Sequence, residues 1–326
     1  MLAALDHSTQ QYTISIVGAD GRVVASAKGT SVQPASCLSA GFAQPNPALS
    51  TSNSRVYYMD GGTFRWLAAD GGTGSLSLTA SANAYEFSVS PDDARIAVVL
   101  TNYTTTMSQA VYVGPLNGPL TKIYETTDPA GASSGIVPVG WHGGNIVFAY
   151  YPQTCTQGGG PGAGYPREYH IASPLDAHRI AMVGGRCAFV GAPSPAGVAC
   201  GDQASTSATV FDWSGASVHL LAADPQMLAF GVSVLGDRVA MCCAGGKGIQ
   251  VVNVVAGNPT INGDVQRYTY GWIDDSRILI GADGPQDQAL VWDLAGNKQT
   301  PVAAQGDFRG RIPGTLDPGR GTGTGL

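Results

Sequence analysis

The feature that most constrains the fold is an internal repeat with a period of about 40 to 50 residues. Each copy has an apolar strand, a polar turn and a second apolar strand. The clearest copies are Phe87–Val99, Phe230–Met241 and Tyr270–Ile280, and weaker copies are Pro47–Tyr58, Val139–Ala149 and Phe189–Cys200. The residues that open the second strands are Arg55, Arg95, Asn145, Gly197, Arg238 and Arg277, at steps of 40, 50, 52, 41 and 39 residues. This spacing predicts a chain of similar β units packed against one another.

A second pattern follows each copy of the first. It is a strand, a turn rich in Gly, Asn or Asp, and another strand, which is typical of a β-hairpin. The seven hairpins are Thr13–Ser26, Thr63–Leu78, Ala110–Tyr124, Tyr169–Val183, Thr209–Leu221, Ile249–Ile261 and Ala289–Val302. The two patterns together predict an all-β chain of four-stranded antiparallel blades. We expect a seven-bladed β-propeller, with a six-bladed ring as the alternative.

The first hairpin, Thr13–Ser26, has no copy of the first pattern before it. We therefore expect both chain ends to close the first blade, with Met1–Leu5 as its second strand and Phe308–Arg320 supplying its innermost strand. Within that segment, Leu316–Arg320 resembles the Ser90–Arg95 turn. Closure would remove the free sheet edges. Residues 1–326 would then form one domain, with residues 307–326 as a closing strand and Gly-rich tail. The alternative is a disordered tail and a six-bladed ring with an extra hairpin.

Charge and hydropathy exclude several classes of function. The net charge is −6, and the 17 Lys and Arg form no run, so the electrostatic footprint of a nucleic-acid binder is missing. No stretch approaches the ~18 apolar residues that span a bilayer. The first residues, Met1–Gln10, lack the basic and apolar regions of an export signal. We expect no membrane span and, if the protein is exported, a signal that preceded this sequence.

The turn around Ser90–Ala97 (SPDDARIA) resembles the signature of bacterial WD40-like propeller repeats of the TolB type. The Trp of that signature is present at Trp141 and Trp272 and is replaced by Val89 and Val232 in other copies. The resemblance covers most of the chain at the level of repeats and is strong at two or three copies. It implies an extracytoplasmic propeller that binds other proteins or small ligands.

The cysteine pattern favours disulfides over a metal site. The six cysteines show no Cys-x-x-Cys spacing and no neighbouring His pattern. An even number of cysteines without metal spacing indicates an oxidising compartment, although several could equally be small buried hydrophobic residues. The candidate pairs are Cys37 with Cys155 across two long loops and Cys187 with Cys200 within one blade, which leaves Cys242 and Cys243 as a vicinal bond or two thiols.

The sequence offers little support for catalysis. The segment Gly131–Gly135 (GASSG) has the shape of a hydrolase nucleophile elbow, but it lacks the strand before and the helix after that an elbow needs. The five histidines are not at metal-ligand spacing, and paired acids such as Asp92 with Asp93 are typical of turns. We therefore expect no cofactor and no metal. His142, on an innermost strand, is the residue on which an alternative lyase or hydrolase centred in the channel would depend.

Four long loops fall on one face of the expected ring: Gly29–Asn46, Thr101–Gln109, Thr126–Val137 and Pro152–Glu168. Long loops carry binding function more often than strands do. Residues from these loops and near the inner strand ends form the candidate contact surface, namely Trp141, His142, Tyr165, Tyr268, Tyr270, Trp272, Arg309 and Arg311. For the two tryptophans, packing between blades is the alternative.

The combined evidence predicts a non-catalytic binding scaffold, an exported bacterial propeller that contacts a protein or cell-envelope partner through its loop-rich face. The central channel is a further candidate site for a small ligand. The alternatives are the channel-centred enzyme and a structural propeller module of a larger surface or signalling protein.

Overall fold

The structure is a computed structural model. It describes residues 2–6, 11–30, 49–79, 84–102, 107–128, 135–151, 166–185, 187, 189–191, 193–201, 207–222, 229–242, 248–257, 259–262, 269–280, 288–304 and 307–312.

The described strands form seven four-stranded antiparallel sheets. Sheet 1 contains β28 (Asp307–Arg311), β1 (Leu2–Asp6), β2 (Gln11–Val17) and β3 (Val23–Thr30), in that spatial order. Sheet 2 contains β4 (Leu49–Thr51), β5 (Arg55–Asp60), β6 (Thr63–Ala68) and β7 (Thr73–Thr79), and sheet 3 contains β8 (Ala84–Val89), β9 (Arg95–Asn102), β10 (Met107–Pro115) and β11 (Thr121–Asp128). Sheet 4 contains β12 (Gly135–His142), β13 (Asn145–Tyr151), β14 (Glu168–Ala172) and β15 (Arg179–Val183).

The remaining three sheets follow the same order from inside to outside. Sheet 5 contains β16 (Phe189–Val190), β17 (Val198–Gly201), β18 (Ser207–Phe211) and β19 (Ser217–Ala222). Sheet 6 contains β20 (Ala229–Val232), β21 (Arg238–Cys242), β22 (Gln250–Asn253) and β23 (Pro259–Asn262). Sheet 7 contains β24 (Thr269–Trp272), β25 (Arg277–Ile280), β26 (Leu290–Asp293) and β27 (Lys298–Pro301).

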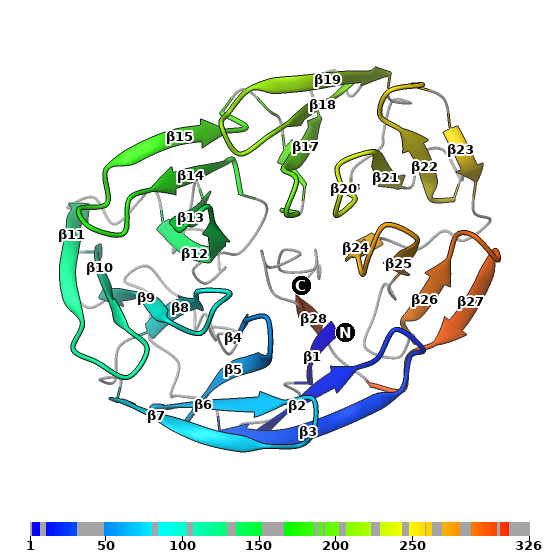
Figure 1. The fold of residues 1–326 in the computed structure, drawn as a ribbon. Coiled ribbons are helices and arrows are strands. Elements are labelled where there is room, and N and C mark those ends of the chain that lie inside the picture. The colour runs from blue at the N-terminus through cyan, green and yellow to red at the C-terminus, as the bar shows by residue number, and fades with distance from the viewer. Residues whose placement is uncertain are drawn as a thin grey trace.

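The sheets stand around a central axis, with the first strand of each near the middle and the last at the rim (Figure 1). The all-β propeller expected from the sequence is therefore confirmed. The described part of the chain contains no helix long and apolar enough to cross a membrane.

Burial on both faces explains why the second strand of each sheet is a continuous apolar run. In β9, Ile96 and Val98 pack into a cluster shared with sheet 2, whereas Ala97 and Val99 pack into one shared with sheet 4. Successive side chains of a strand point to opposite faces, so a strand covered on both sides needs apolar residues at every position. The apolar second strand in each copy of the sequence repeat is therefore a consequence of burial on both faces.

Hydrophobic clusters lie between neighbouring sheets, and one of them joins sheet 7 to sheet 1. Val17 of β2 packs with Ile273, Leu279 and Val291 of sheet 7. On its other face, sheet 1 packs against sheet 2, where Ile14 meets Val56. Sheet 1 therefore closes the ring by packing on both of its neighbours.

The two ends of the chain meet within sheet 1. β28 pairs antiparallel with β1, with Leu2 opposite Arg311 and Leu5 opposite Asp307, and the register shifts between Ala3 and Ala4. This is the pairing expected from the unmatched first hairpin. The expected Met1–Leu5 strand begins one residue later, and the innermost strand ends at Arg311, so the Leu316–Arg320 segment lies outside the described residues.

Candidate functional site

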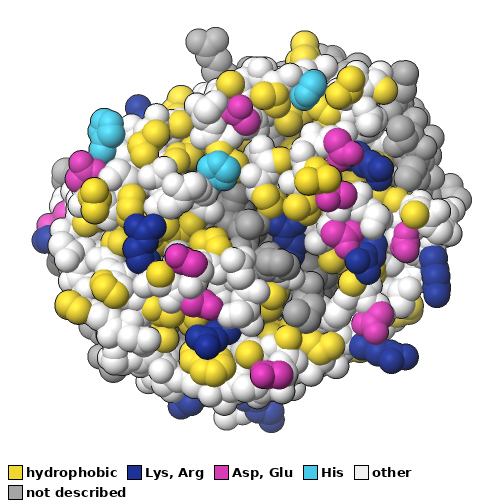
Figure 2. Space-filling view, in the orientation of Figure 1, with side chains coloured by type: hydrophobic (Ala, Val, Ile, Leu, Met, Phe, Trp, Pro, Cys, Tyr) yellow, Lys and Arg dark blue, Asp and Glu magenta, His cyan; other side chains and the backbone are white. Residues whose placement is uncertain are grey.

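The turns that join the first two strands and the last two strands of a sheet share one face of the ring, which we call the turn face. The described strand ends that lead into the connections between second and third strands, and between sheets, lie on the opposite face, which we call the loop face. The centres of the four long loops expected to bind a partner lie outside the described residues, as do Tyr165, Tyr268, Cys37, Cys155 and Cys243. For Tyr270, Arg309 and Cys242 the structure places the backbone in a strand and does not describe the side chain. The candidate site is therefore built from the turn face, where acidic and basic side chains are interspersed (Figure 2).

A serine at the end of the inner strand organises the turn that follows it. The backbone N–H of Arg95 donates to Ser90 Oγ at 2.8 Å, and that hydroxyl donates to Asp92 Oδ1 at 2.6 Å. The same arrangement recurs in sheet 6, where Arg238 N donates to Ser233 Oγ at 3.1 Å. The hydrogen bond from Ser90 holds the pKa of Asp92 below its ordinary value. Asp92 is therefore a turn residue, as the sequence predicts.

A carboxylate links sheets 2 and 3 across the turn face. Asp93 accepts a hydrogen bond from the Tyr57 hydroxyl at 2.8 Å and another from Ser54 Oγ at 2.7 Å. Tyr57 is fully buried, and burial raises its pKa, so it stays a neutral donor at physiological pH. Asp93 has a φ of 59°, which Asp tolerates better than most residues. The second acid of this turn is therefore a connector between sheets.

We expect the Tyr57–Asp93 hydrogen bond to stabilise the ring by about 1 to 2 kcal/mol, because one partner is ionised and the other is buried. A double-mutant cycle with Tyr57→Phe and Asp93→Gly, followed by urea unfolding, measures this coupling energy. Gly removes the carboxylate and adopts positive φ without strain. Strictly additive effects of the two substitutions would show that the bond contributes nothing.

The two tryptophans of the predicted contact surface lie between sheets. Trp141 and Trp272 are 3% and 4% exposed. The Trp141 indole N–H donates to the Ser88 carbonyl of sheet 3 at 3.2 Å, and that of Trp272 donates to the Gly231 carbonyl of sheet 6 at 2.7 Å. Both rings are therefore packing and hydrogen-bonding groups, which is the alternative considered from the sequence, and neither presents a surface to a partner.

Arginines that open the second strands reach across to the next sheet. Arg95 Nη2 donates to the Gly144 carbonyl at 3.1 Å, and its guanidinium lies 4.8 Å from the centre of the Trp141 ring. Arg238 Nη1 donates to the Asp275 carbonyl at 3.3 Å. The sequence repeat marks these arginines but does not reveal this role. The sequence does contain one related regularity. The carbonyls that accept from the two arginines belong to Gly144 and Asp275, and each of these is the third residue after a tryptophan.

His142 is exposed on the turn face beside sheet 5. Its ring lies 6.0 Å from that of Trp213, measured between centroids, at an angle of 37°. Partial burial lowers the pKa of His142, and the nearby Asp212 opposes that shift. Among the described residues, no hydrogen bond joins His142 to an acid that would orient it, as a catalytic histidine usually requires. Of the predicted contact residues whose side chains the structure describes, His142 is the exposed one.

Arg311 lies on the innermost strand β28 and is 7% exposed. Burial lowers its pKa, and the carboxylates of Asp275 and Asp274 oppose this shift. These acids belong to the first turn of sheet 7. The closing strand of sheet 1 therefore places a buried cation in the field of the neighbouring sheet.

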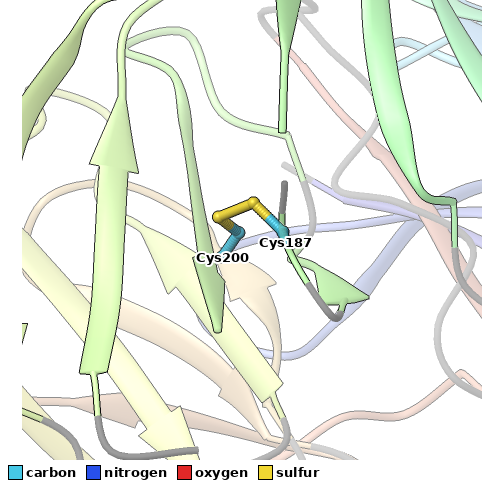
Figure 3. The surroundings of a disulfide bond; sticks show 2 residues. All are labelled: Cys187 and Cys200. Atoms are coloured by element: carbon cyan, nitrogen blue, oxygen red, sulfur yellow. A yellow bond between two sulfur atoms is a disulfide. The ribbon is translucent and has the colours of Figure 1, made fainter. Parts of the chain in front are cut away.

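The predicted Cys187–Cys200 disulfide is present in sheet 5, with the two Cα atoms 5.6 Å apart (Figure 3). It ties the segment before β16 to β17, whose Cys200 packs in the cluster between sheets 4 and 5. The other proposed pairs involve residues outside the described part of the chain or, for Cys242, a side chain that is not described.

We expect this disulfide to contribute about 2 to 3 kcal/mol, because it closes a short loop with a sequence separation of 13. Urea unfolding of the wild type with and without dithiothreitol measures the effect. The Cys187→Ala/Cys200→Ala variant is the control and should unfold at one urea concentration under both conditions. The prediction would be contradicted if the wild type unfolded at the same urea concentration with and without dithiothreitol while thiol labelling showed both sulfurs reduced.

The described residues contain no group of three or more His, Cys, Asp or Glu that could hold a metal ion. Several of their carboxylates, such as those of Asp92 and Asp93, serve turns and contacts between sheets.

Neither the comparison with protein families nor that with curated proteins found a match. The comparison with solved structures did, and one similar chain comes from the crystal structure of a mitotic checkpoint complex. The two are 15% identical, with a TM-score of 0.50, over 82% of this chain and 80% of that one. The likeness supports a propeller fold. At this identity it shows the fold alone, and the fold hosts many functions.

Proposed function

We propose that this protein is a non-catalytic scaffold that binds another protein. The observation that supports this most is the use of polar groups on the turn face. The polar side chains described there bond to turns or to neighbouring sheets, as seen for Asp93, Arg95, Arg238 and Asp274. In an enzyme, we would expect an acid, a base or a nucleophile directed at a substrate instead. A rigid ring that presents short, hydrogen-bonded turns is suited to recognition, because little conformational entropy is lost on binding.

We further propose that residues 1–326 form one domain in which each of the seven sheets is a blade. The pairing of β28 with β1 and the contact of Val17 with sheet 7 support this count. Electron-microscopy class averages viewed along the ring axis would test it. Seven wedges around the channel are expected, and six wedges with a detached hairpin would favour the six-bladed alternative.

An exported, TolB-like bacterial protein with a protein or cell-envelope partner remains our proposal for its location. The Cys187–Cys200 disulfide supports it, because such bonds persist mainly in oxidising compartments. Thiol trapping in intact native cells tests the location. Cys187 and Cys200 protected from alkylation until reductant is added would agree with export, and alkylation of both without reductant would contradict it.

Photo-crosslinking in native cells tests the binding function. A photoreactive amino acid is placed at Arg167, an exposed residue just before β14 on the loop face, at Val255 on the turn face, where that side chain is 82% exposed, and at Val24 on the outer strand β3 as the control. We expect one protein to crosslink from a face position and not from Val24. Crosslinks that are equal at all three positions, or absent from both faces, would contradict the proposal.

A further inference from the structure

One methionine is exposed on the outer strand of sheet 4, at the rim of the ring (Figure 1). Of the six methionines in the sequence, the structure describes the side chains of Met59, Met182 and Met241. Met59 and Met241 are each 2% exposed, whereas Met182, on β15, is 43% exposed. Peroxides convert the thioether of methionine to a sulfoxide. Among these three, Met182 is therefore the side chain that an oxidant in solution can reach.

The local backbone brings a hydrogen-bond donor to this sulfur. Arg179 Nη1 lies 4.0 Å from Met182 Sδ, within reach of a weak hydrogen bond to sulfur. In a regular strand, residues three apart point to opposite faces. Here the pairing of β15 with β14 shifts by one residue and leaves Ile180 as an extra residue, a β-bulge. The bulge thus places Arg179 and Met182 on the same face of the sheet.

The guanidinium of Arg179 is not committed to an acid. A Cβ built on Gly185 would lie 2.8 Å from Met182 Cε and 2.9 Å from Glu168 Oε2, so a carboxylate is close to the methionine. That carboxylate pairs instead with His170 Nε2, at 2.6 Å. Among the described residues, no ion pair involves Arg179. Its N–H donors, which are bonded only weakly by a thioether, are therefore available to a stronger acceptor.

We propose that Met182 is a modification site at which hydrogen peroxide converts the thioether to a sulfoxide, and that Arg179 then donates a hydrogen bond to the sulfoxide oxygen. The sulfur attacks one peroxide oxygen, and the O–O bond breaks as the S–O bond forms. The departing hydroxide takes up the proton of the transferred hydroxyl and leaves as water. Sulfur is oxidised by two electrons, and the peroxide is reduced by two.

The oxidation would change the chemistry of the rim of sheet 4. Ile180 is 54% exposed and Met182 43%, so β15 presents two apolar side chains to solvent. A sulfoxide replaces one of them with a polar group that Arg179 can hold in place, and methionine sulfoxide reductases can reverse the change. The site is independent of the proposed binding function.

Peptide mapping by mass spectrometry tests the first half of the proposal. The full chain is treated with dilute hydrogen peroxide for increasing times, and the sulfoxide at each methionine is measured. We expect Met182 to be oxidised at least ~10-fold faster than Met59 and Met241, because the two buried side chains react only when the fold opens locally. Equal rates at the three positions in protein that circular dichroism shows to be folded would overturn the proposal.

NMR spectroscopy tests the second half. The guanidinium N–H signals of Arg179, assigned by their loss in Arg179→Lys, are followed before and after oxidation of the full chain. A hydrogen bond to the sulfoxide should slow their exchange with water at least ~3-fold. The matched control is Met182→Leu, which keeps the side-chain volume and cannot be oxidised at this position. Its Arg179 signals should be the same before and after peroxide.

Two results would refute the role of Arg179. One is unchanged exchange of its N–H groups in wild-type protein whose Met182 is fully oxidised. The other is an equal change in Met182→Leu, which would assign the effect to oxidation elsewhere in the chain. Neither depends on the photo-crosslinking result, so failure at this site would leave the scaffold function standing.

Discussion

Truncation of the chain after residue 306 is expected to remove most of the stability of the fold, a loss of about 5 kcal/mol or more in the free energy of unfolding. It deletes β28, which pairs with β1, and Ile312, which is 3% exposed and packs in the cluster between sheets 1 and 2. The edge of β1 would then face the channel unpaired, and the buried apolar surface on both sides of sheet 1 would become partly exposed. Urea unfolding followed by circular dichroism measures the change.

A truncation after Ile312 is the control, because it keeps β28 and the buried Ile312 side chain. It should unfold at nearly the same urea concentration as the full chain. A second variant, Gly310→Val, leaves the chain length unchanged and tests the same contact, since a Cβ at Gly310 would overlap Thr51 of β4. If both truncations were equally unstable, or Gly310→Val were as stable as wild type, closure by β28 would not be what stabilises the ring.

Trp272→Ala is expected to cost about 3 to 5 kcal/mol, the usual range for truncating a buried Trp. The substitution leaves a cavity in the cluster between sheets 6 and 7 and removes the hydrogen bond to the Gly231 carbonyl. Trp272→Phe keeps much of the volume and loses the indole N–H, so it should cost clearly less than the alanine. Urea unfolding of both variants separates packing from hydrogen bonding.

Trp66→Ala is the matched comparison for Trp272→Ala. Trp66 lies on the third strand of sheet 2, is partly exposed and supports the guanidinium of Arg55 at 4.3 Å. Its removal should cost about half as much or less, because less apolar surface returns to water. Equal losses at the two positions would show that burial between sheets does not set the effect.

The strand plan of the fold could be predicted from the sequence because each strand pair leaves a local signal. The turn at Ser90–Arg95 and the hairpin at Ala289–Val302 both combine apolar strands with turn-forming residues. The unmatched hairpin at Thr13–Ser26 revealed the pairing of the chain ends, although its partner is a distant segment. The expected segment Phe308–Arg320 includes most of the innermost strand Asp307–Arg311, and residues 313–320 lie outside the described part of the chain.

The candidate site could be predicted only in part. Trp141 and Trp272 have the composition of a contact surface, and only the packing of one sheet on another shows that their indoles bond to carbonyls of the previous sheet. The hydrogen bond from Arg95 to the Gly144 carbonyl joins two sheets, so no single stretch of sequence reveals it. His142 was identified from its place at the end of an inner strand, and the structure leaves it accessible.

The pairing of β1 with β28 also determines how the ring responds to mechanical load. Leu2 is opposite Arg311, so the two outermost residues of the pair lie at the same end of the ladder. A force that draws the chain ends apart therefore acts on one backbone pair at a time, beginning with this one, rather than on all of them in shear. The hydrogen bonds between β28 and β1 would break one after another. Each of the other six sheets is formed from four consecutive strands of the chain, so no such pair of chain ends occurs in them. Sheet 1 is thus the place where tension applied through the termini would first open the ring.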